Sequence, residues 1–251
     1  MIELQDIYKS FGENDVLKGI TTEFLPGKTN LIIGKSGSGK TVCIKCSIGL
    51  FEVNKGAVIY DGRNFTIMSK SEKKSVRKEI GMLFQGNALF DSMTVEENVR
   101  FPLDMFSKKT KAEKNARVDE VLERVELEEA HKKYPSEISG GMQKRVGIAR
   151  AIVLQPRYLF CDEPNSGLDP QTALVIDELI KEITIEQNIT TVINTHDMNS
   201  VMGIGDNILF IHEGHKHWQG SSEEILTSRN QELEDFIFAS EFLKKLKNQQ
   251  I

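Results

Sequence analysis

Short runs of consecutive apolar residues alternate with longer amphipathic stretches along this chain. Such runs are typical of buried parallel strands when helical segments separate them. They occupy residues 31–33, 80–84, 158–161 and 191–193. At the N-terminus, Ile2 and Leu4 alternate with polar neighbours, which predicts a strand with one exposed face.

Two further segments predict hairpins. Residues 58–60 run into Asp61-Gly62, and residues 208–211 run into Glu213-Gly214. Dipeptides of this kind favour the tight turns that join antiparallel strands. We therefore expect a mixed sheet, with a parallel core and an antiparallel flank.

The middle of the chain is helical in pattern. Thr94 with Glu97 is a capping box, and residues 108–129 are highly charged with one apolar face. A further helix should start near Ser139 and stop before Pro156. We expect its core face to carry Met142, Val146, Ala149 and Val153.

These elements predict one α/β domain over residues 1–251. Its core should comprise residues 1–84 and 158–222, interrupted by a helical subdomain over 85–157. Residues 223–251 should form a C-terminal extension, helical to about residue 247.

Composition narrows the class of protein. The chain has 251 residues, of which 39% are hydrophobic and 27% charged, as in ordinary globular domains. A net charge of −5 does not favour a general grip on nucleic acid. No stretch approaches the roughly 18 apolar residues of a membrane helix, and three cysteines suit a reducing cytosol. We expect an intracellular protein whose membrane role, if any, comes through a partner.

The strongest local motif is a glycine-rich loop between a strand and a helix. Its sequence is Gly34-Lys35-Ser36-Gly37-Ser38-Gly39-Lys40-Thr41, which fits the phosphate-loop pattern. Its glycines let successive backbone N–H groups point at phosphate oxygens, and the helix adds its positive end. Lys40 would reach the β- and γ-phosphates, and Thr41 would ligate Mg²⁺.

A second motif places two carboxylates at the end of an apolar strand. Asp162 and Glu163 follow residues 158–161 directly. Beside a phosphate loop, Asp162 would hold Mg²⁺ and Glu163 would act as general base on the attacking water.

A third motif opens the helix that starts near Ser139. Gly140 and Gly141 follow this N-cap and would form a second phosphate-sized nest. One γ-phosphate does not need two such nests from one chain. The nest is therefore expected to serve a nucleotide held by a second copy.

Together these motifs resemble the nucleotide-binding subunit of ABC transporters over nearly the whole chain. Residues 35–41 resemble Walker A, 158–163 Walker B and 138–143 the family signature. The resemblance implies further roles for single residues. It makes Gln85 the Q-loop residue that senses Mg²⁺ and the membrane partner, and Asp169 part of the D-loop. His196 would be the switch histidine that contacts the γ-phosphate. Phe11 would stack on the adenine, and Val16 would contact the ribose.

The resemblance also implies a working unit. The fold would be a P-loop NTPase with a helical subdomain, and the activity a Mg²⁺-dependent ATPase. Two copies would pair head to tail around two ATP molecules and drive integral membrane permease subunits. Lys40, Gln85, Glu163 and His196 would be catalytic, and Mg²⁺ would be held by Thr41, Gln85 and Asp162.

Finer similarities point to one branch of the family. Ile138 and Met142 depart from the usual Leu-Ser-Gly-Gly-Gln signature, and Asn165 replaces a common threonine. The methionine, with residues 82–95 and 98–103, is similar to the Mla or Mce-associated ATPases, which drive phospholipid traffic across the bacterial envelope. That branch implies a periplasmic lipid-binding Mce-type subunit and a place at the cytoplasmic face of the inner membrane.

Other functions remain as alternatives. The chain could power a small-solute importer or an exporter. ABC-type ATPases of DNA ends and ribosomes fit poorly, because they carry long coiled coils or two ATPase units. A regulator without turnover is disfavoured by Glu163 and His196.

Two side-chain groups have simpler interpretations than metal sites. Cys43 and Cys46 lie three apart on one predicted helix, and no second pair completes a zinc site. His212, His215 and His217 lack a completing carboxylate or cysteine pattern. We expect the cysteines to be packed in the core.

Overall fold

A computed structural model describes residues 1–238 of the chain. These residues divide into two compact units. Unit 1 comprises Met1–Leu25, Thr29–Ile67 and the chain from Asn194 onward, and unit 2 comprises Pro26–Lys28 and Met68–Ile193. Each unit is described by itself.

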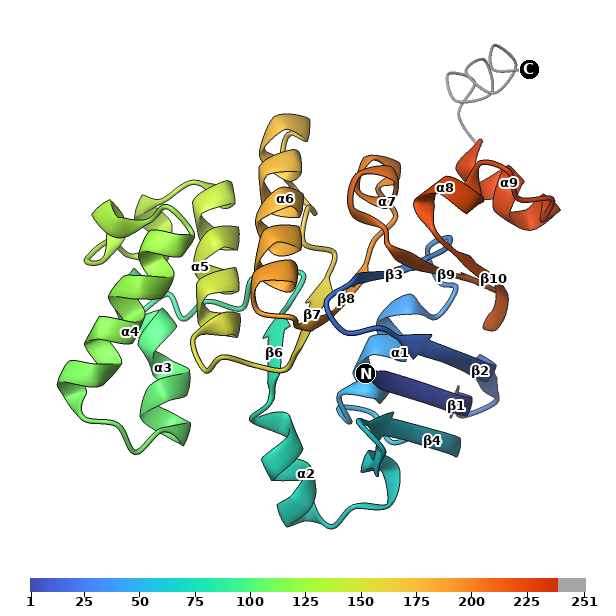
Figure 1. Cartoon of the computed structure of the whole chain (residues 1–251), viewed down its shortest axis with the longest axis horizontal. Coiled ribbons are helices and arrows are strands. Elements are labelled where there is room, and N and C mark those ends of the chain that lie inside the picture. Colours follow the sequence, from blue (N-terminus) through green and yellow to red (C-terminus); the bar gives the residue numbers. More distant parts are fainter. Residues whose placement is uncertain (239–251) are drawn as a thin grey trace. The chain divides into compact units, whose positions relative to one another are not determined.

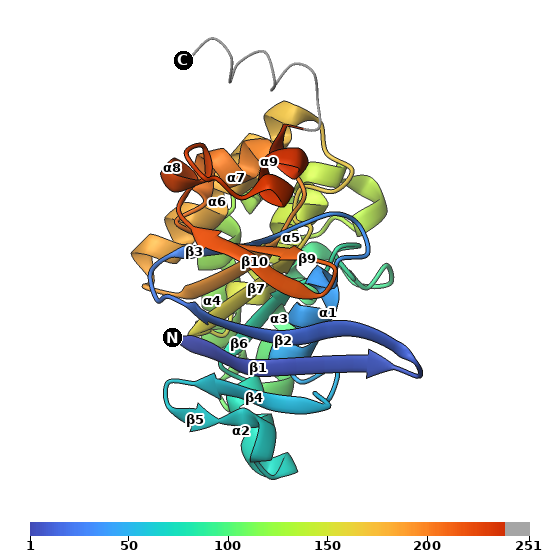
Figure 2. The same cartoon turned by 90° about the vertical axis from the view of Figure 1, so that its right-hand side faces the viewer.

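Unit 1 contains two layers of strands, of which Figure 2 shows the antiparallel layer side by side. This layer has the order β2-β1-β4-β5, and in the second layer β3 pairs in parallel with β9, which pairs antiparallel with β10. Its elements are β1 (Ile2–Phe11), β2 (Asn14–Phe24), β3 (Thr29–Ile33), α1 (Lys40–Ser47), β4 (Lys55–Tyr60), β5 (Arg63–Asn64), η1 (Phe65–Ile67), α7 (Met198–Ile204), β9 (Asn207–His212), β10 (His215–Gly220), α8 (Ser222–Ile225) and α9 (Gln231–Ile237).

Unit 2 combines parallel strands with a group of helices. β6 pairs in parallel with β7, β8 lies beside β7, and α3, α4 and α5 pack on one another (Figure 1). Its elements are α2 (Lys70–Arg77), β6 (Ile80–Leu83), α3 (Val95–Phe106), α4 (Lys111–Arg124), η2 (Glu128–Ala130), η3 (Pro135–Glu137), α5 (Gly140–Ile152), β7 (Tyr158–Asp162), α6 (Pro170–Glu186) and β8 (Thr190–Asn194).

The hydrophobic pattern explains these elements. β3, β7 and β8 are buried along their whole length, as their continuous apolar runs predict, whereas β1 buries Ile2, Leu4 and Ile7 and leaves its other residues partly or fully exposed. Both predicted hairpins are present, as β4–β5 and β9–β10. The mixed α/β architecture is thus confirmed.

The helix termini follow local capping chemistry. Thr94 and Glu97 form the predicted capping box of α3, and Ser139 caps α5 by accepting a hydrogen bond from the Met142 amide. Val118, Val121 and Leu122 of α4 are buried, as predicted.

Two expectations need correction, and three helices were missed. Met142 is only partly buried, because it lies in the first turn of α5, away from the buried residues in the middle of that helix. The single helix expected from residue 223 is two short helices, since Asn230 caps a new one at α9. Residues 239–251 lie outside the described part of the chain. Finally, α2, α6 and α7 were not predicted.

The cysteines pack as expected. Cys43, Cys46 and Cys161 are buried free thiols. Burial raises the pKa of the Cys46 thiol to about 11, and it raises the pKa values of the other two as well. Since the thiolate is the reactive form, these side chains behave as core hydrophobes.

Candidate ATP site

The phosphate loop, residues 34–41 of unit 1, connects β3 to α1. Gly34 has φ 149°, and a Cβ there would lie 2.2 Å from the backbone oxygen of Ile211. Gly39 has φ 105°, and its Cβ would lie 3.0 Å from the Val16 oxygen. Neither position can hold a side chain, so these two glycines fix the path of the loop.

Lys40 is folded back onto this loop. Its ammonium donates to the carbonyl oxygens of Gly34 at 2.8 Å and Lys35 at 3.2 Å, and only 8% of the residue is exposed. The loop's own main chain therefore places a cation beside the amides that open α1. This is the arrangement that phosphate binding requires.

The start of α1 fits a bound anion. Its N-cap, Gly39, supplies no side-chain oxygen to the first turn. Ser38 Oγ is buried without a hydrogen-bond partner among the described residues. A buried hydroxyl of this kind is satisfied when a ligand oxygen reaches it. The residues of the loop therefore fit a nucleotide phosphate.

The other predicted residues of unit 1 lie near this loop or at the end of β1. Thr41 Oγ1 accepts a hydrogen bond from Asn194 Nδ2 at 3.0 Å, and the exposed His196 follows two residues later. Val16 packs on Gly39 through its backbone. Phe11 is 44% exposed, with its ring 5.2 Å from that of Phe51.

The predicted residues of unit 2 end β7 and open the next loop. Asp162 is the last, buried residue of the strand, and Glu163 follows with φ 52°. A left-handed backbone at a non-glycine residue costs about 1–2 kcal/mol. Such strain is often found at functional positions, where the surrounding structure holds it.

The loop after Glu163 is held by α6. Asn165, the departure from the family pattern, donates to Asp177 Oδ1 at 2.8 Å. Asp169 caps α6 by accepting from the amides of Gln171 and Thr172. The hydrogen bond from the Thr172 hydroxyl, followed by these amides, lowers the pKa of Asp169. The asparagine thus has a structural role here.

The glycine pair behind Ser139 forms the first turn of α5. A Cβ on Gly141 would lie 2.7 Å from Thr172 Cγ2, so this turn packs closely on α6, whereas Gly140 is open to solvent. The open backbone keeps the predicted nest accessible.

Gln85 is exposed in a segment that we call the Gln85 loop, residues 84–90, after β6. An apolar groove of about 640 Å³ lies beside this loop, entirely within unit 2. Its lining includes Phe84, Phe90, Phe101 and Phe106, with Lys74, Arg77, Lys78 and Arg150 as cations. An exposed apolar groove of this size is typical of a site for another molecule.

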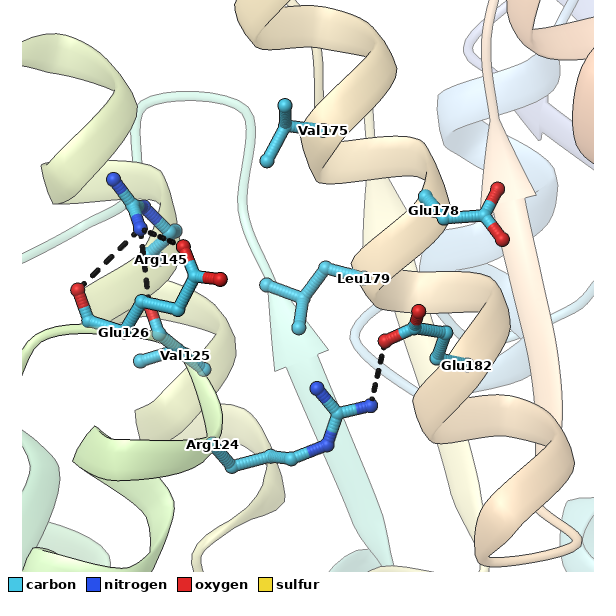
Figure 3. Close-up of a pocket in the computed structure, with 8 residues that line it drawn as sticks. All are labelled: Arg124, Val125, Glu126, Arg145, Val175, Glu178, Leu179 and Glu182. Carbon is cyan, nitrogen blue, oxygen red and sulfur yellow. Dashed lines mark hydrogen bonds and ion pairs between the residues drawn. The ribbon is translucent and has the colours of Figure 1, made fainter.

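A second, smaller cleft of about 240 Å³ lies between α6 and the α4–α5 helices (Figure 3). Arg124 reaches across it to Glu182 at 2.9 Å and also binds Glu186. Arg145 points instead at Glu126. None of the predicted ATP-site residues lines this cleft.

Sequence reasoning missed two cations of α5. Lys144 and Arg150 both donate to carbonyl oxygens of the Gln85 loop. The only signal in the sequence was their place among the apolar residues of a helix.

Comparison with known proteins supplies the family. Residues 17–166 match the ABC transporter family, which covers more than half of the chain. This chain belongs to that family. It is accordingly an ATPase that uses ATP with Mg²⁺, and its fold class is that of the ABC ATPases.

Three curated relatives share over a third of their aligned residues with the chain. A probable ribonucleotide transport ATP-binding protein of Mycobacterium leprae is 38% identical, with 94% of this chain and 68% of that protein covered. TRIGALACTOSYLDIACYLGLYCEROL 3 of Arabidopsis thaliana is 36% identical, with 96% and 74% covered. The methionine import protein MetN of Clostridium tetani is 36% identical, with 97% and 76% covered. The chain thus spans two thirds to three quarters of these relatives.

Two solved structures are similar in fold. The dimeric ATP-binding cassette MJ0796 bound to ADP and Pi has a TM-score of 0.80 and 30% identity, with 88% of this chain and 99% of that chain covered. The cbiO1 protein of Clostridium perfringens, part of the transporter complex cbiONQ, has a TM-score of 0.85 and 28% identity, with 99% and 98% covered.

Proposed function

We propose that this ABC transporter ATPase powers lipid movement across a bacterial cell envelope. The groove beside the Gln85 loop supports a role in driving a membrane partner. Among residues 1–238 no helix is long and apolar enough to cross a membrane. An ATPase of the ABC transporter family would pass the energy of ATP to a membrane partner, and the groove offers an apolar surface for it.

The groove has the character of a docking site for a short amphipathic helix. The ring centroids of Phe90 and Phe101 lie 4.9 Å apart with the rings tilted, and Phe84, Phe90 and Phe106 are 38–44% exposed. Apolar side chains on one face of a partner helix would cover these rings. We assign this occupant to the cytoplasmic part of a permease, which would hold the ATPase at the inner membrane.

The lipid assignment rests on sequence similarity. Met142 and residues 82–103 are similar to the phospholipid-trafficking branch, and the Arabidopsis relative is named after a glycerolipid. A periplasmic lipid-binding subunit of Mce type would then complete the transporter.

The chemistry that we propose assigns a role to each predicted site residue. Lys40 would hold the β- and γ-phosphates, His196 would contact the γ-phosphate and Glu163 would accept a proton from the attacking water. Mg²⁺, held by Thr41, Asp162 and Gln85, would neutralise charge on the phosphates. Phe11 and Val16 would contact the base and ribose, and Ser139, Gly140, Gly141 and Asp169 would serve the ATP of a second copy in a head-to-tail dimer.

A small-solute importer is the second candidate. It is favoured by the relatives named for methionine import and ribonucleotide transport. Substrate response separates the two candidates.

The test is purification of the chain with its membrane partners, followed by ATPase measurements. We expect a permease and a lipid-binding subunit to co-purify, and phospholipid to change the ATPase rate. A rate that responds to methionine or a ribonucleotide, and not to lipid, would contradict the lipid assignment and leave the ATPase assignment intact.

A groove variant tests the docking surface separately. Phe90→Glu should abolish co-purification of the permease, because it places a carboxylate among the aromatic rings. Ile185→Glu, at a position that is 60% exposed on α6 outside the groove, is the matched control. Equal recovery of the permease with both variants would rule the groove out.

A further inference from the structure

The Gln85 loop is held by two cations that both come from α5. Lys144 Nζ donates to the Gln85 carbonyl oxygen at 2.9 Å. Six residues further along the same helix, Arg150 donates to the carbonyl oxygens of Asn87 at 2.5 Å and Ala88 at 2.7 Å. The main chain of the loop is therefore attached to α5 at three carbonyl groups.

The two residues that Arg150 binds have an unusual backbone. Asn87 has φ 58° and Ala88 has φ 51°, both in the left-handed region. Asparagine tolerates this region and alanine does not. The turn is tight, since the Ala88 amide donates to the Gly86 oxygen at 2.6 Å. This backbone conformation directs two successive carbonyl groups at the Arg150 guanidinium, and the two hydrogen bonds offset the strain.

Burying the charged side chain of Lys144 at this position costs free energy. Lys144 is 2% exposed, and burial lowers the pKa of its ammonium, while the nearby Cys161, Glu163 and Asp162 oppose that change. A buried charge persists where acceptors and opposite charges surround it. Lys144 thus donates to the Gln85 carbonyl, and its positive charge is favoured by the carboxylates that end β7.

The opposite end of α5 carries Ser139, the N-cap of the predicted nucleotide nest. Arg150 also lines the groove beside the Gln85 loop. One helix therefore carries the nest, both loop contacts and part of the groove.

We propose that Lys144 and Arg150 are positioning residues that clamp the Gln85 loop to α5, so that loop and nest move as one body. The clamp deepens the proposed function, and it rests on that function only for the role of Gln85. A partner that displaces the groove-lining end of the loop would carry the nest with it. Release of Arg150 would let residues 87 and 88 leave their left-handed conformation and separate the groove from the nest.

The first test measures amide hydrogen exchange over residues 84–90 in the full chain. Arg150→Met should speed exchange there about tenfold or more, because the loop loses two of its three attachments to α5 and keeps only the Lys144 bond and the bonds of Asn98 to Phe90. Arg145→Met is the matched control, since Arg145 lies on the same helix and binds the carbonyls of Val125 and Glu126 (Figure 3). It should leave residues 84–90 unchanged.

Additional variants keep the test decisive if Arg150→Met fails to fold. Arg150→Lys keeps the charge and the apolar stem but not the planar fork, and it should give an intermediate rate. Lys144→Met should speed exchange near Gln85. Unchanged exchange over residues 84–90 in folded Arg150→Met or Arg150→Lys would overturn the clamp.

A double-mutant comparison tests whether Arg150 holds the strained turn. Ala88→Gly removes the side chain that opposes the left-handed backbone, so it should shrink the effect of Arg150→Met on exchange. Gln155→Gly is the control, because Gln155 is also left-handed, with φ 54°, and donates its amide to Ile152 instead. An equal effect of Arg150→Met in both glycine backgrounds would contradict the strain argument.

Steady-state kinetics then connect the clamp to Gln85. Arg150→Met should lower kcat about tenfold and leave the ATP dissociation constant within twofold. In a Gln85→Ala background the same substitution should cause no further loss. If Gln85→Ala itself leaves kcat unchanged while exchange still reports the clamp, the proposed role of Gln85 fails and the clamp stands. An equal loss of kcat in both backgrounds would overturn positioning through Gln85.

Discussion

The phosphate loop and the Gln85 loop both follow a strand of a parallel pair, and both contain left-handed residues, but different forces hold them. In the phosphate loop the positive φ values fall on Gly34, Gly37 and Gly39. In the Gln85 loop they fall on Asn87 and Ala88, while Gly86 keeps an ordinary φ. The phosphate loop is shaped by its own glycines, whereas the Gln85 loop is held by α5, a helix that contacts it but is distant in the sequence.

The phosphate loop can therefore keep its conformation by itself, whereas the conformation of the Gln85 loop depends on contacts from outside the loop. Glycine adopts the left-handed region without a steric cost, so the phosphate loop needs no external support. For Ala88 the same region costs about 1–2 kcal/mol, and in the proposed clamp the hydrogen bond from Arg150 to the Ala88 carbonyl offsets that cost. The first design suits the proposed binding of phosphate, and the second suits the proposed response of the Gln85 loop to a partner.

The largest expected effect separates the tasks of the two regions. Glu163→Gln should cut ATP hydrolysis by roughly 10²–10⁴, the usual contribution of a general base, and leave ATP binding at the phosphate loop intact. Single-turnover hydrolysis and a nucleotide titration measure the two quantities. Glu178→Gln on the exposed face of α6 is the control. Equal loss of binding and hydrolysis would contradict the division of tasks.

The converse substitution acts on the phosphate loop. Lys40→Ala should weaken ATP binding by about 10²-fold or more. In the proposed site it removes two charge-assisted hydrogen bonds, to the β- and γ-phosphates, of about 1.5–3 kcal/mol each. Lys35→Ala removes an exposed cation from the same loop and should have little effect. Calorimetric titration with ATP compares them. Similar affinities for the two variants would remove Lys40 from the site.

A milder effect is expected at the aromatic platform. Phe11→Ala should weaken ATP binding by about 1–3 kcal/mol, the usual value of one base–aromatic stacking contact. Binding of tripolyphosphate, which has no base, should not change. Parallel loss with both ligands would show that Phe11 supports the loop rather than the base.

The smallest effects compare one glycine from each loop. Gly37 has φ 81° with open space around it, so Gly37→Ala should cost about 1–2 kcal/mol through the backbone alone. Gly86 has open space and no left-handed backbone, so Gly86→Ala should stabilise by about 0.4–1 kcal/mol. Thermal unfolding of both variants tests the pair, and the same sign for both would refute the distinction.

The sequence predicted those parts of the molecule whose physics is local. Buried strands, the capping box at Thr94, the N-cap at Ser139 and the phosphate loop follow from neighbouring residues. The left-handed Ala88 could not be predicted, because alanine carries no signal for it and its partner is 62 residues away. The role of Asn165 was hidden for the same reason, since Asp177 lies on the next helix.

The clamp binds carbonyl groups, and this has a consequence for how the surface changes over evolutionary time. Every residue type offers the same main-chain carbonyl, so the hydrogen bonds from Lys144 and Arg150 do not themselves select side chains; only the left-handed backbone of residues 87 and 88 does. Phe84 and Phe90, which face the groove, are free to vary while the loop keeps its attachment. An unchanged α5 can therefore hold loops with different side chains at the groove. In the proposed function, the groove could then adapt to a different membrane partner while α5 and its contacts to the loop stay the same.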